Sequence, residues 1–153
     1  MMDALLHAHS GLRYIVLLLL LIAIFQGFMG MSGKKVFTNG NRKIALFAMI
    51  SCHIQLLLGL VLYFFGNVGL ATITNPALDS VMGNPVARFW GVEHITGMIL
   101  AIALITIGHS KSKKANEDKA KFKKIAIFFT LGLIIIFATI PWPFREAIAR
   151  GWF

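Results

Sequence analysis

Four apolar stretches of this chain are long enough, or nearly long enough, to cross a lipid bilayer as helices. They cover residues 14–31, 44–65, 89–108 and 125–140. A spanning helix needs about 20 residues, because it rises about 1.5 Å per residue and the hydrocarbon core is roughly 30 Å thick. The fourth stretch is short, but Pro141-Trp142-Pro143 directly after it can form its interfacial end. With 58% hydrophobic residues, against about 45–50% in soluble domains, the chain has too much apolar surface for a water-facing fold.

We therefore expect an all-α fold, a membrane-spanning four-helix bundle that forms one domain over residues 1–153. The expected spans are about 12–31, 43–65, 88–109 and 124–141. In the tail at 143–153, Phe144, Ile148 and Trp152 recur every four residues, opposite Arg145 and Glu146. This spacing is typical of an amphipathic helix that lies in the membrane interface.

The basic residues set the expected orientation of the bundle. The connections 32–43 and 109–124 together carry eleven basic and two acidic residues, whereas the rest of the chain carries four of each. By the positive-inside rule these two connections face the cytoplasm, so both termini and the connection at 66–87 face outward. These two connections account for the whole net charge of +9. Lysine-rich connections of this kind predict contact with lipid head groups and no binding of nucleic acid.

Polar side chains inside these spans mark the expected functional site. His53, Glu93, His94 and His109 lie within the apolar stretches or at their ends. Hydrocarbon solvates an imidazole or a carboxylate poorly, so such residues usually face a bundle interior, a cavity or a bound group. The leading explanation is a haem whose iron is held by histidines from two helices, because apolar walls hold the porphyrin and imidazoles ligate the iron.

His53 and His94 are the first choice of axial ligands. Counted from the outer ends of their helices, His53 lies about 15 Å deep and His94 about 9 Å deep, a mismatch that helix tilt can absorb. His9 and His109 are the alternatives, with His9 expected at or above the outer surface and His109 at the inner one. A ligand role for His9 would need the first helix to sit lower than its apolar stretch indicates. A hydrogen-bonded pair of His53 and His94 without a cofactor stays open, as does a purely interfacial His109.

Three arginines are candidates to hold the haem propionates. Arg13, Arg88 and Arg145 all lie near the outer interface, with Glu93 just beneath it, and arginine binds carboxylates through a bidentate fork. The alternative is that Arg13 pairs with Glu93 and that the other two arginines anchor helix ends.

The third span also carries a stripe of small residues. Gly91, Gly97, Ala101 and Gly108 fall near one meridian of an ideal helix. Small residues let a neighbouring helix approach closely, and the same stripe would also admit the flat face of a porphyrin.

Five short motifs together resemble one family of membrane proteins. They are His9-Ser10-x-x-Arg13-Tyr14, Cys52-His53-x-Gln55-Leu56, Phe89-x-x-x-Glu93-His94, Gly108-His109-Ser110 and Ile140-Pro141-Trp142-Pro143-Phe144-Arg145. As a set they are similar, over nearly the whole chain, to small bacterial four-helix membrane proteins usually labelled cytochrome b. The resemblance implies b-type haem and electron transfer in the bacterial cytoplasmic (inner) membrane. Larger di-haem cytochromes b carry two histidines on each of two helices, whereas here only the third span has such a pair, which favours one haem or none.

The resulting expectation is a haem-binding (b-type) electron-transfer protein, or a subunit of a respiratory membrane complex, rather than a stand-alone enzyme. Quinol is a candidate partner, menaquinone is a second candidate cofactor, and Glu93 could accept a quinol proton. The alternative is a cofactor-free structural or accessory subunit of a larger membrane complex. A third hypothesis is a small carrier or proton-conducting site built on Glu93, His94 and His53. Besides the lipid bilayer, the expected partners are other membrane proteins or further copies of this chain.

Overall fold

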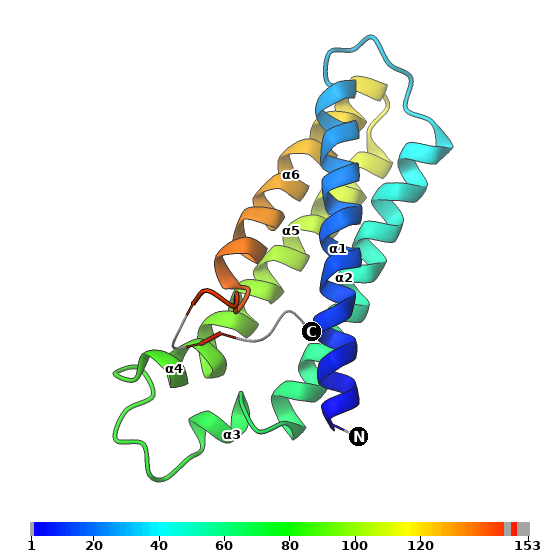
Figure 1. Cartoon of the computed structure of the whole chain (residues 1–153). Coiled ribbons are helices and arrows are strands. Elements are labelled where there is room, and N and C mark those ends of the chain that lie inside the picture. The colour runs from blue at the N-terminus through cyan, green and yellow to red at the C-terminus, as the bar shows by residue number, and fades with distance from the viewer. Residues whose placement is uncertain (1, 146–147, 150–153) are drawn as a thin grey trace.

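Four long helices form the body of the molecule. The computed structural model describes residues 2–145 and 148–149, and no strand occurs among them. The long helices are α1 (Met2–Gly30), α2 (Asn39–Phe65), α5 (His94–Lys114) and α6 (Asp118–Thr139). Each packs against two neighbours, in the cyclic order α1, α2, α5, α6 (Figure 1). The expected all-helical, four-helix architecture is confirmed.

Three short elements connect α2 to α5 at the end of the bundle where the N-terminus lies (Figure 1). They are α3 (Leu70–Ile73), α4 (Pro85–Arg88) and the π-helical turn η1 (Phe89–Glu93). The Asn84 side chain accepts hydrogen bonds from the backbone N–H groups of Val86 and Ala87, both at 3.0 Å, and so caps α4. The chain continues without a break from α4 through η1 into α5. The geometry of η1 therefore sets the direction of His94, the first residue of α5.

The helices extend beyond the expected spans. α1 begins at Met2 rather than near residue 12, and its 29 residues measure about 43 Å along the axis, more than the hydrocarbon thickness. α5 continues to Lys114 and α6 begins at Asp118, so most of the basic connection expected at 109–124 is helical. Lysine is a good helix former, and hydropathy marks only the apolar part of a helix, which explains both differences.

Large apolar side chains cover the outside of all four long helices. Leu18 on α1, Leu57 on α2, Leu100 on α5 and Ile134 on α6 are each more than half exposed. All four helices are long and apolar enough to cross a membrane. Soluble monomers rarely expose this much apolar surface to water. The architecture is therefore that of a multi-pass membrane protein whose outer face contacts lipid.

Glycines bring α5 and α6 into close contact. A Cβ atom at Gly97 would collide with Thr139, and one at Gly108 would collide with Phe128. From the other side, a Cβ atom at Gly132 of α6 would come within 2.8 Å of Ile105. The part of the small-residue stripe that lies on α5 is thus covered by α6, as tight packing predicts, and Gly91 is covered by Ile73 of α3. The stripe therefore offers no flat surface to a porphyrin.

The two basic connections lie at the same end of the bundle, opposite the N-terminus (Figure 1). Successive spans alternate in direction, so the first and third of the connections between spans lie on one side of the membrane. Which side this end occupies stays a prediction. In the tail, the described residues 143, 144 and 148 lie in turns, and the Ile148 N–H donates to the Arg145 carbonyl at 2.9 Å. The remaining residues of the expected amphipathic helix, 146–147 and 150–153, lie outside the described residues.

Candidate functional site

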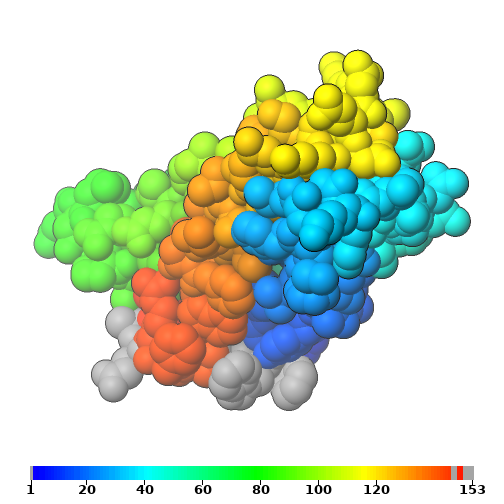
Figure 2. Space-filling model, turned by 90° about the horizontal axis from the view of Figure 1, so that it is seen from above, coloured from blue at the N-terminus to red at the C-terminus, as the bar shows by residue number. Residues whose placement is uncertain are grey.

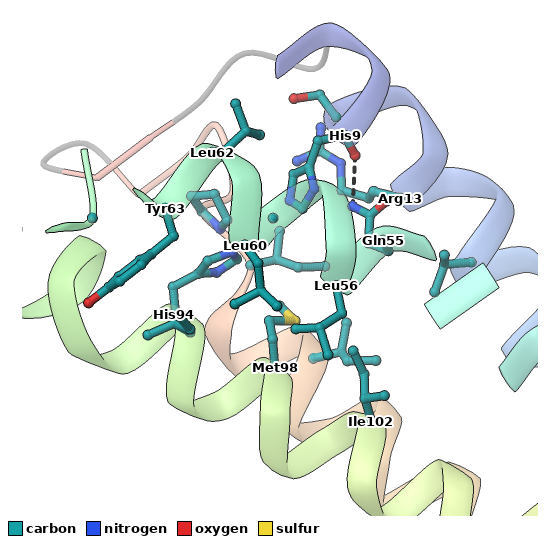
Figure 3. Close-up of a pocket in the computed structure, with 18 of the residues that line it drawn as sticks. His9, Arg13, Gln55, Leu56, Leu60, Leu62, Tyr63, His94, Met98 and Ile102 are labelled. Atoms are coloured by element: carbon teal, nitrogen blue, oxygen red, sulfur yellow. Dashed lines mark hydrogen bonds between the residues drawn. The ribbon is translucent and has the colours of Figure 1, made fainter. Parts of the chain in front are cut away.

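A cavity of about 130 Å³ opens within the bundle at the N-terminal end. All four long helices contribute to its walls, together with η1 and the turn that follows α2. Most of the lining is apolar, with side chains such as Leu56, Leu60, Met98 and Ile102 (Figure 3). Two histidines, His9 from α1 and His94 from α5, reach this cavity.

His94 is held in a defined orientation. Its Nδ1 lies 2.7 Å from the backbone carbonyl oxygen of Thr139 on α6. A carbonyl oxygen only accepts, so Nδ1 carries the proton and Nε2 keeps its lone pair. The rings of Phe89 and Trp90 each lie 5.9 Å from the imidazole, centroid to centroid. His94 therefore presents an unprotonated ring nitrogen from a fixed side chain.

The π-helical turn contributes to this placement. Such turns add a residue to the helix and are frequent at functional sites. Here the His94 N–H donates to the Phe89 carbonyl, five residues back, and Trp90 and His94 both line the cavity. Glu93 is directed away from it and is exposed. The Tyr63 hydroxyl donates to the Gly91 carbonyl at 3.0 Å and ties this turn to α2.

The His9 ring packs against α2 at Gly59. A Cβ atom at Gly59 would lie 3.0 Å from the His9 Cε1, so a larger side chain there would displace the ring. The Gln55 side chain, one turn earlier on α2, donates to the His9 backbone carbonyl at 2.7 Å (Figure 3). Among the described residues, the buried Nδ1 of His9 has no hydrogen-bond partner. A buried polar atom without a partner is costly, and a ligand in the cavity would supply the missing contact.

His53, the first-choice partner of His94, does not line this cavity. Its Nδ1 lies 2.8 Å from the Met49 carbonyl oxygen, and its Nε2 lies 3.4 Å from the Thr106 hydroxyl on α5. Gln55 and His53 are about 200° apart around an ideal helix. Because Gln55 is directed toward His9 on α1, His53 points away from α1 and faces α5 near Thr106, outside the cavity. The structure brings His94 together with His9, not with His53.

The candidate propionate ligands separate in the same way. Arg13 is buried, with 8% of its surface exposed, and lines the cavity, where its guanidinium lies 4.9 Å from the Tyr14 ring centroid. Arg88 instead pairs with Glu93, with 2.6 Å between Nε and Oε1. Arg145 donates to the Ala138 carbonyl at 3.1 Å and so anchors the end of α6. Of the three arginines only Arg13 can reach a group bound in the cavity.

His109 lies far from this cavity, at the basic end of the bundle. It lines a small second cavity of about 10 Å³ together with Arg42 and Lys113. No cluster of three or more His, Cys, Asp or Glu residues suited to a metal ion occurs within residues 2–145 and 148–149.

The roles of several cavity residues are not predicted by the sequence. Gln55 and Gly59 are spaced four apart on one helix face, a signal that could have pointed to a contact with another helix. The contribution of Thr139 is a backbone carbonyl, which no side-chain pattern reveals. Comparisons of the chain with protein-family models, curated proteins and solved structures found no match. Its function is therefore inferred from the chemistry of the site.

Proposed function

We propose that this chain is a bacterial cytoplasmic-membrane protein that binds a b-type haem between His9 and His94 and passes single electrons. The observation that carries the proposal is that imidazoles from two helices reach one apolar cavity, each with a ring nitrogen available. As proposed from the sequence, such a protein would act alone or as a subunit of a respiratory complex.

The residues present suit this group. Haem iron takes two imidazole ligands, and ligating histidines usually donate their other ring N–H to a carbonyl, as His94 does to Thr139. Leu56, Met98 and similar side chains give the low-dielectric surroundings that tune a redox potential. The Arg13 guanidinium at the cavity is placed to hold a propionate. A bound haem would supply the one-electron chemistry, and these residues would orient it and exclude water.

The size of the cavity sets a condition on this proposal. An apolar cavity of about 150 Å³ binds benzene, and the present cavity, at about 130 Å³, is of that class. A porphyrin needs more room, which α2 and α5 would have to provide by moving apart. Of the four neighbouring pairs of long helices, these two make the sparsest contacts.

A quinol head group is the second candidate occupant, and the cavity volume favours it. One six-membered ring fills a space of this class without helix movement. His9 and His94 would then hydrogen-bond the ring oxygens, and the chain would serve as a quinone-binding subunit. With either occupant the site consists of the same two histidines.

An absorption spectrum of detergent-purified protein, supplied with hemin and reduced with dithionite, tests the proposal. We expect a Soret band that shifts on reduction in the wild-type protein and in the control variant His53→Ala. We expect His9→Ala and His94→Ala to lose the band while circular dichroism shows unchanged helix content. A full spectrum in His9→Ala contradicts the ligand assignment.

A colourless wild-type preparation would overturn haem binding, and extraction of bound quinone then decides between the remaining functions. Menaquinone that co-purifies with the wild-type and His53→Ala proteins, but not with His9→Ala, supports the quinol site. Absence of both groups supports the cofactor-free structural subunit.

A further inference from the structure

The basic end of the bundle contains a second group of side chains gathered around a cavity. Arg42 from α2, His109 and Lys113 from α5, and Lys121 from α6 line it, and we call these four residues the basic site. Figure 2 views this end, where residues 31–43 in cyan and 109–120 in yellow lie next to each other. α2 thus directs a cationic side chain to the same place as two consecutive helices, α5 and α6, that are distant from it in sequence.

Apolar side chains also line this cavity. Phe37, Ala45 and Ile125 line it together with the basic site. The Phe37 ring packs edge-on against Phe122, with 4.9 Å between centroids, and Lys121 Nζ lies 5.9 Å from the Phe37 centroid. A cavity lined by both apolar and cationic side chains suits a ligand that has a charged group next to an apolar body.

The positive charge of the basic site is largely uncompensated. Two ion pairs occur among the described residues, Arg88 with Glu93 and Lys121 with Asp118. Neither pair includes Arg42 or Lys113, and His109 interacts electrostatically with both of these cations. Like charges gathered around one cavity repel each other, so an anion bound among them would be stabilised.

We propose that the basic site binds the phosphate of an anionic phospholipid head group. Arginine and lysine are the side chains that bind phosphate, arginine through a bidentate fork. Basic pockets between transmembrane helices bind anionic lipids where the helices leave the hydrocarbon. Exposed apolar residues, such as Phe47 on α2 and Ile107 on α5, begin within two turns of the site and would contact acyl chains.

The small volume of the cavity places the phosphate at its mouth. At about 10 Å³ the cavity has room for one water molecule. The phosphate oxygens would therefore lie among the side chains of the basic site and not inside the cavity. Inorganic phosphate shares this chemistry. The lipid is favoured because the site lies at the end of apolar spans, where head groups are concentrated.

Native mass spectrometry of the purified chain with phosphatidylglycerol or phosphatidylcholine of identical acyl chains tests this proposal. We expect the wild-type protein to prefer phosphatidylglycerol by about tenfold, and the double variant Arg42→Gln/Lys113→Gln to lose most of that preference. The matched control is Lys43→Gln/Lys114→Gln. It removes the same charge from the next residue of each helix, outside the cavity lining, and should keep the preference.

Equal losses in both double variants would show attraction to general surface charge and overturn the site. A third arm adds inorganic phosphate at millimolar concentration. If phosphate binds the wild-type protein in an Arg42-dependent way while the two lipids bind equally, the ligand is soluble phosphate and the lipid assignment is wrong. If neither lipid nor phosphate shows a preference, the proposal fails. These outcomes do not depend on the occupant of the histidine cavity.

Discussion

At the scale of single residues, the site depends on the space that Gly59 leaves for the His9 ring. The His9 ring lies against Gly59, where a Cβ atom would come within 3.0 Å of its Cε1, and the Gln55 amide donates to the His9 backbone carbonyl at 2.7 Å. A partly buried imidazole loses hydration, and its Nδ1 gains no replacement among the described residues. Such a cost is typical of a position kept for a ligand rather than for stability.

Gly59→Leu should therefore remove ligand binding without unfolding the protein. The new side chain would occupy the space of the His9 ring and displace it from the cavity. We expect the bound haem or quinone of purified protein to fall by about tenfold or more, since one ligating group is lost. Gly11→Leu is the control, because a Cβ atom at Gly11 meets nothing within 4 Å. If both variants keep their ligand, His9 has no role in binding.

At the scale of elements, the bundle is held together by helix pairs of unequal closeness. α5 and α6 pack glycine against side chain along their length, at Gly97, Gly108 and Gly132. α2 and α5 make the sparsest contacts of the neighbouring pairs. Small residues allow backbones to approach and gain dispersion energy in lipid, where the hydrophobic effect between helices is absent. The α5–α6 pair is thus the most closely packed of the neighbouring pairs.

Gly108→Leu should destabilise the fold. A side chain there collides with Phe128 of α6, and overpacking of this kind costs about 1–3 kcal/mol. Ala103→Leu adds the same kind of bulk to an exposed position of α5 and should have little effect. Thermal unfolding in detergent, followed by circular dichroism, measures both. A midpoint for Gly108→Leu equal to that of Ala103→Leu would show that the α5–α6 contact is loose.

At the scale of the whole molecule, apolar and charged surfaces occupy different regions. The outer faces of the long helices expose large apolar side chains, whereas the two basic connections lie together at one end (Figure 1). Positive charge is retained on the cytoplasmic side during insertion. From this rule we expect the cavity with His9 and His94 to lie toward the outer face and the basic site toward the cytoplasmic leaflet.

Cysteine labelling in intact cells checks this orientation. A membrane-impermeant maleimide should label Ser80→Cys in intact cells and Lys114→Cys only after lysis. Both positions are exposed. The unmodified chain is the control, since its single cysteine, Cys52, is buried and should not react. Labelling of Lys114→Cys before lysis would invert the proposed topology and place the basic site at the outer leaflet.

The sequence alone determined the number of long helices, their approximate positions and the separation of apolar from basic surface. These properties depend on local composition, because hydrocarbon selects about 20 apolar residues wherever a helix crosses it. The sequence also predicted that histidines would lie among apolar neighbours, and it placed His94 on the correct element. The expected span begins at about residue 12, whereas the helix α1 begins at Met2, since the segment before the apolar stretch is helical without being strongly apolar.

Only the tertiary structure decided which histidines share a cavity. That outcome depends on how each helix is rotated about its axis, and the rotation is set by contacts between residues far apart in the chain. Gly59 admits His9, and the glycines of α5 turn one face toward α6, while the Thr139 carbonyl fixes the His94 ring. Neighbouring residues of a helix point about 100° apart. A modest rotation of α1 or α2 about its axis therefore decides whether His9 or His53 faces the cavity.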